Sequence, residues 1–283
     1  MTPIRPFGGE RVLVPTGSES AAIDRRAISE QGVAQPVLME NAGRSAAAVV
    51  HRLFPEGEVV AVVGSGNNGG DAFVCLRSLA AWGRTVQAVV VGDRPEPEDV
   101  LHGWPVERIA DGEAVDGGAA WLAGAAVVVD GILGTGIRGA PRERQAAAID
   151  RVNAAGRPVV ALDIPSGVDA DTGTVPGKAV RADITVAFGW PKLGSLLHPG
   201  RRLAGRLLAF EIGFPPAGDA DAGAWIVTPG WASVRMPRRP PATHKNAVGT
   251  LLVVAGSRGM AGAAVMAGRA ALRAGAGLVR IAS

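Results

Sequence analysis

The chain has 283 residues, of which 47% are hydrophobic and 19% charged, and it contains one cysteine, Cys75. This composition excludes an intrinsically disordered chain and a disulfide-bonded scaffold, and it fits one large or two modest globular domains. The formal net charge is only +3, and the densest basic stretch, residues 235–245, is interrupted by prolines and lacks interleaved aromatic side chains, so nucleic-acid binding is not expected. No apolar run approaches the ~20 residues of a membrane span, and the first thirty residues lack a signal-peptide pattern. We therefore expect a cytoplasmic protein without membrane contact.

The order of the predicted elements indicates an α/β fold. Thr16 and Glu19 have the spacing of a capping box, which predicts a helix to about Gln31, and a second helix is expected over residues 40–53. Short β-branched runs then alternate with alanine-rich helical patterns, as in parallel strands joined by crossover helices. The sequence therefore predicts a three-layer αβα, Rossmann-like sandwich with a mainly parallel sheet. Its strands are expected near residues 59–63, 86–91, 126–130, 158–163, 184–188 and 207–212, with further helices over 71–82 and 142–154.

The glycine-rich stretch at residues 62–71 is the most informative segment. It follows a predicted buried strand and precedes a predicted helix. Gly64, Gly66 and Gly69 allow the backbone to turn sharply and to approach a ligand, and the unpaired N–H groups at the start of a helix attract anions. The segment therefore predicts a phosphate or diphosphate site.

Two further predicted strands end in polar, glycine-containing loops, at residues 130–139 and 163–173. Because the carboxyl ends of parallel strands meet at one edge of the sheet, we expect the side-chain oxygens of Asn68, Asp130 and Ser166 to converge there. Hard cations prefer such oxygens, and only one of the three side chains is charged, which favours a monovalent ion. A structural interpretation stays open, in which Asp130 caps a helix and Ser166 bonds its own turn.

Four motifs occur together in this chain: residues 38–43 (LMENAG), 66–71 (GNNGGD), 130–136 and 163–173. Together they resemble the NAD(P)H-hydrate epimerase family, and the resemblance covers about residues 12–214. That family repairs a damaged cofactor by interconverting the R and S forms of hydrated NADH or NADPH, which carry a hydroxyl on the ring carbon beside the nitrogen. The resemblance implies an isomerase and a homodimer.

The resemblance also implies the site residues. A potassium ion would be bound by Asn68, Asp130 and Ser166, the oxygens that the converging loops bring together. Asp163 matches the acid beside the ring, and Lys192 falls where the family also carries a lysine, which suggests a catalytic role. Hydrated NADH or NADPH is expected to contact Asn67, Asn68, Gly69, Gly70, Asp71, Gly134, Thr135, Gly136, Ile137, Arg138, Gly139, Ala140 and Asp163.

The implied chemistry needs one acid–base group and good orientation. A carbon that bears a hydroxyl beside a ring nitrogen can lose water to give an iminium, and water can then add to the opposite face. We hypothesise that Asp163 serves the oxygen, while potassium and the glycine loops hold the diphosphate end so that the ring is positioned.

Two other functions stay open. An NAD(P)-dependent oxidoreductase would use the glycines as a G-x-G-x-x-G fingerprint with Asp93 as the ribose-binding acid, but it would not explain Asn67, Asn68 or the turn after Asp163. A noncatalytic nucleotide-binding or interaction module could share the fold, and we would expect such a module to lack the oxygen ligands Asn68, Asp130 and Ser166.

The sequence changes character after residue 228, where the expected epimerase domain (residues 1–228) ends. Residues 229–243 are predicted to be a proline-rich linker. Residues 244–283 resemble the start of a ribokinase-like, ADP- or ATP-dependent NAD(P)H-hydrate dehydratase. The resemblance implies a multifunctional repair enzyme in which this domain follows the epimerase domain. About forty residues forming strand, helix and strand bury little surface. We therefore expect an incomplete segment without dehydratase (lyase) activity, which is disordered, docked on the first domain or prone to aggregation.

Overall fold

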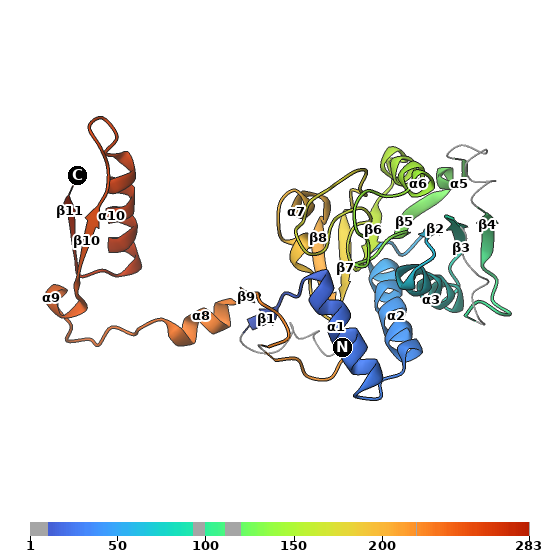
Figure 1. Cartoon of the computed structure of the whole chain (residues 1–283), viewed down its shortest axis with the longest axis horizontal. Helices are drawn as coiled ribbons and strands as arrows, with labels where there is room; N and C mark the ends of the chain where they lie inside the picture. The colour runs from blue at the N-terminus through green and yellow to red at the C-terminus, as the bar shows by residue number, and fades with distance from the viewer. Residues whose placement is uncertain (1–10, 93–99, 111–119, 219, 283) are drawn as a thin grey trace. The chain divides into compact units, whose positions relative to one another are not determined.

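The computed structural model describes residues 11–92, 100–110, 120–218 and 220–282, and it divides the chain into two compact units, residues 1–228 and 229–283. Across the described part of the N-terminal unit, seven strands form one sheet in which all neighbours are parallel (Figure 1). The strand order is β4 (Glu107–Ala110), β3 (Val86–Val90), β2 (Glu58–Val63), β5 (Ala125–Gly131), β6 (Val159–Leu162), β7 (Ile184–Phe188) and β8 (Arg206–Phe210).

The strand order fixes where a ligand can bind. The chain runs outward from β2 through β3 to β4, returns to the centre, and then runs outward in the other direction from β5 to β8. The neighbours β2 and β5 therefore mark the point at which the direction of winding reverses. In open parallel sheets, ligands bind outside the carboxyl ends of the strands at this switch point. The glycine loop after β2 and the loop after β5 flank it.

Helices cover both faces of the sheet (Figure 1). In β2, Val59, Ala61 and Val63 belong to the core that packs under α2 (Gln35–Leu53) and α3 (Asn67–Ala81). The alternate residues, Val60 and Val62, belong to the core under α5 (Ala120–Ala123) and α6 (Glu143–Ala154). Because successive strand residues point to opposite faces and both faces are covered, the central strands β2, β5 and β6 are almost entirely apolar. The predicted three-layer αβα sandwich is confirmed.

Several element boundaries differ from the sequence-based expectation. Helix α3 begins at Asn67 instead of residue 71, because Gly66 is extended (φ −89°, ψ −172°) and serves as the N-cap. Residues 67–70, which the sequence placed in a loop, therefore form the first helical turn. Helix α2 begins at Gln35 with a proline in its first turn, where the missing N–H costs no hydrogen bond. The four-residue strand β4 was not predicted.

Helix α1 (Gly17–Ser29) begins at the predicted capping box. The Thr16 hydroxyl accepts the Glu19 N–H at 3.1 Å, and the Glu19 carboxylate accepts the Thr16 N–H at 2.7 Å. The Leu193 N–H donates to the Pro15 carbonyl at 2.9 Å, so the segment after β7, with the 3-10 helix η1 (Leu193–Ser195) and α7 (Gly200–Leu203), is held against the start of α1. Strand β1 (Arg11–Leu13) pairs antiparallel with β9 (Trp225–Val227), which joins the beginning and end of this unit.

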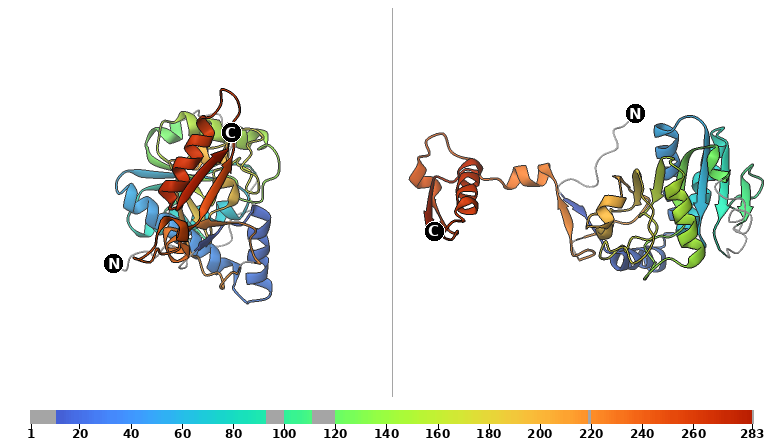
Figure 2. Two further views of the ribbon diagram at one scale, coloured as in Figure 1. Left: turned by 90° about the vertical axis from the view of Figure 1, so that its left-hand side faces the viewer. Right: turned by 90° about the horizontal axis from the view of Figure 1, so that it is seen from above.

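The C-terminal unit contains α8 (Pro229–Arg235), α9 (Lys245–Val248) and a parallel pair of strands, β10 (Thr250–Val254) and β11 (Leu278–Ala282), joined by α10 (Gly262–Ala274). Figure 2 shows α10 lying along the strand pair. Gly268 permits this close packing, since a Cβ there would lie 2.8 Å from Ile281 Cδ1. Helix α8 falls in the range predicted as a linker. Residues 244–282 contain helices and a parallel strand pair, and the expectation that this segment is disordered, docked or prone to aggregation stays a prediction.

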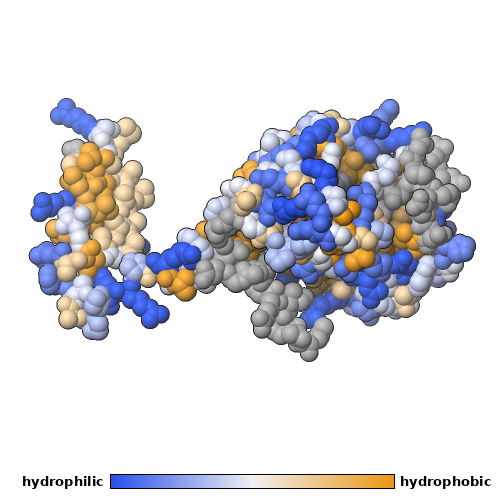
Figure 3. All heavy atoms as spheres, turned by 60° about the horizontal axis from the view of Figure 1, so that its bottom comes forward, coloured by the Kyte–Doolittle hydropathy of each residue, from blue (hydrophilic) through white to orange (hydrophobic). Residues whose placement is uncertain are grey.

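Much of the apolar surface of the C-terminal unit is exposed. Leu252, Val254 and Met266 are 60%, 77% and 68% exposed, and Figure 3 shows this unit largely in the hydrophobic colours. Within the described ranges, no helix of either unit combines the length and the apolar character that crossing a bilayer requires.

Candidate functional site

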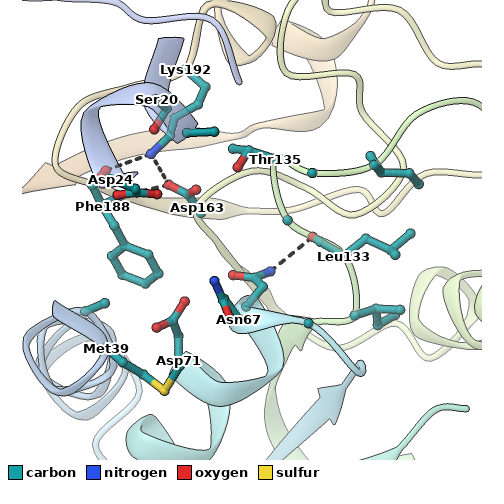
Figure 4. A pocket seen from close by; sticks show the side chains of 18 of the residues that line it. Ser20, Asp24, Met39, Asn67, Asp71, Leu133, Thr135, Asp163, Phe188 and Lys192 are labelled. Carbon is teal, nitrogen blue, oxygen red and sulfur yellow. Dashed lines mark hydrogen bonds and ion pairs between the residues drawn. The ribbon is translucent and has the colours of Figure 1, made fainter. Parts of the chain in front are cut away.

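A cavity of about 640 Å³ opens at the carboxyl ends of the central strands. Its walls come from α1, α2, the first turn of α3, the loop after β5, and the residues that follow β6 and β7. The volume lies in the range of small-molecule sites, and the position is the switch point between β2 and β5. Figure 4 shows Asn67 and Asp71 on one wall, with Asp163, Lys192 and Asp24 across from them.

The glycine loop brings β2 and β5 together below the cavity. The Gly64 N–H donates to the Gly131 carbonyl at 3.0 Å, and a Cβ on Gly64 would lie only 1.9 Å from the Ile132 carbonyl oxygen. Gly64 is therefore required by packing. By contrast, a Cβ on Gly66 would meet no atom within 4 Å, and Gly66 lines the cavity. The open space beside Gly66 and the start of α3 suits an anionic group.

Three side-chain oxygens gather beneath this loop. The Ser166 hydroxyl lies 2.5 Å from Asp130 Oδ1, and the Ser166 N–H donates to Asp130 Oδ2 at 2.9 Å. The Ser166 hydroxyl also lies 3.1 Å from the Leu133 carbonyl oxygen, which accepts Asn68 Nδ2–H at 3.0 Å. Asn68, Asp130 and Ser166 are thus held around one short segment, as loop convergence predicts.

This cluster has the properties of a cation site. Asn68 Oδ1 is buried and has no hydrogen-bond partner among the described residues, which is costly for an amide oxygen unless another group binds it. Asp130 is fully buried, and this burial raises its pKa to about 6, although hydrogen bonds from Ser166 and Ile132 oppose the rise. An amide oxygen, a carboxyl group and a hydroxyl, on residues linked through the Leu133 carbonyl and the Asp130–Ser166 contact, form a donor set that hard cations prefer.

Asp163 lies at the end of β6 in an unusual backbone conformation. Its φ is +65°, the left-handed region that non-glycine residues seldom adopt and that clusters at functional sites. Its N–H donates to the Val186 carbonyl at 2.8 Å, and its carboxylate accepts the Phe188 N–H at 3.1 Å. These bonds to β7 hold the carboxylate at the cavity wall.

Lys192 is buried beside Asp163. Its side chain is 2% exposed, its ammonium forms an ion pair with Asp163 Oδ1, and it donates to the Phe188 carbonyl at 2.7 Å. The family resemblance implies that both residues are catalytic candidates, and in the structure their side chains are in direct contact. A buried ammonium needs such a partner, because an unpaired buried charge is strongly destabilising.

The structure places most predicted ligand-binding residues on the cavity and a few behind it. The cavity is lined by Asn67, Asn68, Asp71, Gly134, Thr135, Gly136, Ile137, Arg138, Ala140, Asp163 and Lys192. Gly69, Gly70 and Gly139 do not line it, and Asp130 and Ser166 lie beneath it. Asp93, the acid proposed for a dehydrogenase, lies outside the described residues.

Sequence reasoning missed the contribution of the first two helices. Ser20, Asp24 and Ile28 of α1 line the cavity at helical spacing, and Leu38 and Met39 of α2 line it as well. The i, i+4, i+8 stripe in α1 was visible in the sequence, but nothing there indicated which face of the helix would meet a cavity. Phe188, Ile212 and Phe214 add apolar surface, and Arg142 and Gln145 add polar groups beyond Ala140.

The charged side chains of the cavity form two groups. Asp24, Asp163 and Lys192 lie together in Figure 4, whereas Arg138 and Arg142 both come from the loop after β5. Arg138 Nη2 lies 3.5 Å from Asp171 Oδ2, and Asp171 also accepts the Ser18 N–H at 3.1 Å, which ties this loop to α1. The cavity therefore offers guanidinium groups for an anion and a separate cluster of acid–base groups.

Comparison with known proteins agrees with this architecture. Residues 35–194 match the family described as YjeF-related protein N-terminus. The chain is 41% identical over 278 residues to the bifunctional NAD(P)H-hydrate repair enzyme Nnr of Pyrobaculum aerophilum, covering 95% of this chain and 54% of that protein. For the proteins of the same name from Thermofilum pendens and Escherichia coli, the identities are 38% and 37%, with 94% and 91% of this chain and 52% and 51% of those proteins covered.

The fold has a counterpart among solved structures, the crystal structure of the yeast protein ynu0. It superimposes with a TM-score of 0.62 at 24% identity, covering 74% of this chain and 92% of the yeast chain. The chain spans about half the length of the curated relatives it matches. Because the family match covers more than half of the chain, this chain belongs to the family of YjeF-related protein N-terminal domains.

Proposed function

We propose that the N-terminal unit interconverts the R and S forms of hydrated NADH and NADPH. The relatives carry the name NAD(P)H-hydrate repair enzyme, which supplies the substrate class. The single observation that carries the proposal is the Asp163–Lys192 pair on the wall of a cavity that also exposes the first turn of α3. An acid–base group and an anion-binding helix start in one cavity suit a substrate with a reactive ring and a diphosphate.

The dinucleotide would lie between these two features. The first-turn N–H groups of α3, together with Arg138 and Arg142, would receive the phosphates, because helix starts and guanidinium groups both favour negative charge. The hydrated ring would then lie near Asp163, with Phe188 and Met39 as apolar neighbours. Fixing both ends of the substrate lowers the entropic part of the barrier.

Epimerisation needs no redox change. When the hydroxyl leaves with a proton as water, the ring nitrogen supplies its electron pair and an iminium forms. Water then attacks the opposite face of the same carbon, and a base takes up the released proton. We assign this base to Asp163, whose carboxylate is held at the cavity wall by Lys192 and the Phe188 N–H.

We further propose that potassium occupies the cluster of Asn68, Asp130 and Ser166. The unpartnered Asn68 Oδ1 and the buried Asp130 carboxyl group fit a weakly charged cation. Bound there, the ion would balance the Asp130 charge and fix the segment of Leu133 that lines the cavity. The homodimer implied by the family resemblance stays a prediction, which the molar mass measured by light scattering tests.

The oxidoreductase is the weaker candidate. It depends on Asp93, and it leaves the pairing of Asp163 with Lys192 unexplained. A noncatalytic module would be expected to lose its oxygen ligands, whereas Asn68, Asp130 and Ser166 are all present. Neither alternative accounts for the names that the relatives carry.

The proposal is tested by replacing the base. Asp163→Asn should abolish exchange between the separated epimers, followed by chiral chromatography, while binding of the hydrate changes little. Asp150→Asn is a matched control, because Asp150 is an exposed α6 carboxylate paired with Lys178 at 3.2 Å. Wild-type exchange rates in the Asp163→Asn variant would remove Asp163 from the mechanism.

A further inference from the structure

Asp24 is a carboxyl group that lines the cavity and that the epimerase chemistry described above does not use. It lies on α1, and the residues at i−4 and i+4, Ser20 and Ile28, line the cavity with it. In Figure 4 the Asp24 carboxyl group lies next to the Asp163 carboxyl group and the Lys192 ammonium. Three ionisable groups from three separate elements therefore meet at one place: α1, the end of β6, and the segment after β7.

The charges of these groups do not balance if all are ionised. Lys192 is buried and already forms an ion pair with Asp163, so that pair is neutral overall. An ionised Asp24 would add an uncompensated negative charge next to the Asp163 carboxylate, at a site partly withdrawn from water. Repulsion between the two neighbouring carboxyl groups therefore favours the protonated form of Asp24.

The surroundings of Asp24 also favour its protonated form. Burial raises the pKa of Asp24, and the neighbouring Asp163 carboxylate adds to the rise, while the nearby Lys192 ammonium and Arg25 on the same helix oppose it. Asp24 therefore keeps its proton to higher pH than an exposed aspartate. Asp163 Oδ1, in contrast, already accepts hydrogen bonds from the Lys192 ammonium and the Phe188 N–H.

We propose that Asp24 is the general acid of the epimerase reaction and works together with the Asp163 carboxylate as its base. This inference rests on the proposed function and assigns the acid to Asp24 and the base to Asp163. Asp24 gives its proton to the hydroxyl oxygen as the carbon–oxygen bond breaks, the bonding electrons leave with water, and the ring nitrogen forms the iminium. Water adds to the opposite face, and its proton passes to the Asp163 carboxylate.

The pair is restored by transfer of one proton from Asp163 to Asp24, so the cycle is balanced and consumes no co-reactant. The same pair serves the reverse reaction with the roles exchanged, since an epimerase must protonate a departing hydroxyl from either form. A single carboxyl group would have to be the proton donor and the proton acceptor on both faces of the ring. Two carboxyl groups divide the two proton transfers between them.

The test compares Asp24→Asn with the wild type, using the separated epimers as substrate and correcting for exchange in buffer. Loss of a general acid should lower kcat by about 10²- to 10⁴-fold, with KM changed only a few-fold. The wild-type rate should fall as the pH rises and Asp24 loses its proton, and this alkaline fall should be absent from the residual activity of the variant. Glu30→Gln, which removes an exposed carboxylate from the end of α1, should retain wild-type kinetics.

Asp24→Ala provides a second test that does not depend on the Asn side chain. Formate, a small carboxylic acid, should restore part of its activity in a concentration-dependent way, and should leave Asp163→Asn inactive. The proposal is overturned if Asp24→Asn keeps kcat within about threefold of the wild type, or if both Asp24 variants lose affinity for the hydrate instead of kcat. An inactive wild type would refute the epimerase function itself, which is a different result from an active wild type with active Asp24 variants.

Discussion

Removing potassium should make the N-terminal unit less stable at neutral pH than at mildly acidic pH. The reason is Asp130, which is fully buried and whose pKa is raised to about 6. In the unfolded chain this carboxyl group has its ordinary pKa of about 3.9. A carboxyl group with a raised pKa favours the folded state fully below the unfolded pKa, and this contribution is lost as the pH rises through the folded pKa.

The magnitude follows from the difference between the two pKa values. Each unit corresponds to about 1.4 kcal/mol, so ionising Asp130 in the folded protein costs about 3 kcal/mol, and the cost develops between about pH 4 and pH 6. For a domain of this size, that corresponds to a loss of roughly 6–12 °C in Tm. A potassium ion beside Asp130 would favour the carboxylate and offset most of this loss at neutral pH.

The assay is thermal unfolding at matched ionic strength in potassium chloride and in tetramethylammonium chloride, whose cation is too large for the cluster. The Tm difference between the two salts should be small near pH 4 and should approach its full size above about pH 6. Asn68→Ala removes the unpartnered oxygen and should reduce the difference. Equal Tm values in both salts at every pH would refute the assignment of a cation to these oxygens.

Three further predictions follow from the loops and the cavity. Gly64→Ala should destabilise the fold by more than about 3 kcal/mol, because its Cβ would lie 1.9 Å from a carbonyl oxygen. Gly66→Ala should keep the wild-type Tm and raise KM, because its Cβ would meet no atom within 4 Å and Gly66 lines the cavity. Equal losses of Tm in the two variants would contradict this distinction. Arg142→Gln should raise KM about tenfold through the loss of a phosphate contact, with the exposed Arg206→Gln as the unaffected control, and KM should be measured at two salt concentrations. Lys192→Met should lower kcat strongly and also lower the Tm, because Asp163 loses its buried partner; an unchanged Tm in thermal unfolding would argue against that ion pair.

The fold could be predicted because local signals and the overall arrangement agree in this chain. The strands of the sheet are apolar on both faces, and the helices between them are alanine-rich, so the alternation was readable without any tertiary information. The start of α3 was missed because Asn and Gly are poor helix formers, and only the extended conformation of Gly66 makes them a first turn. Strand β4 was missed because it carries Glu107 and Arg108 at the edge of the sheet.

The candidate site was predictable where it follows strand ends. Asp130 and Asp163 come directly after apolar runs, so their convergence at one edge follows from the parallel sheet. The contribution of α1 could not be predicted, because the approach of Asp24 to Asp163 depends on how the segment after β7 holds the start of that helix. Such contacts between distant segments leave no periodic signal in the sequence.

The most direct test of the proposed function is the rate at which one purified epimer of hydrated NADH becomes the mixture of both. The N-terminal unit should accelerate this exchange far above the rate in buffer, and the acceleration should increase when potassium replaces tetramethylammonium. An exchange rate equal to that of buffer in potassium, with a folded protein, would contradict the assignment of this cavity to epimerisation.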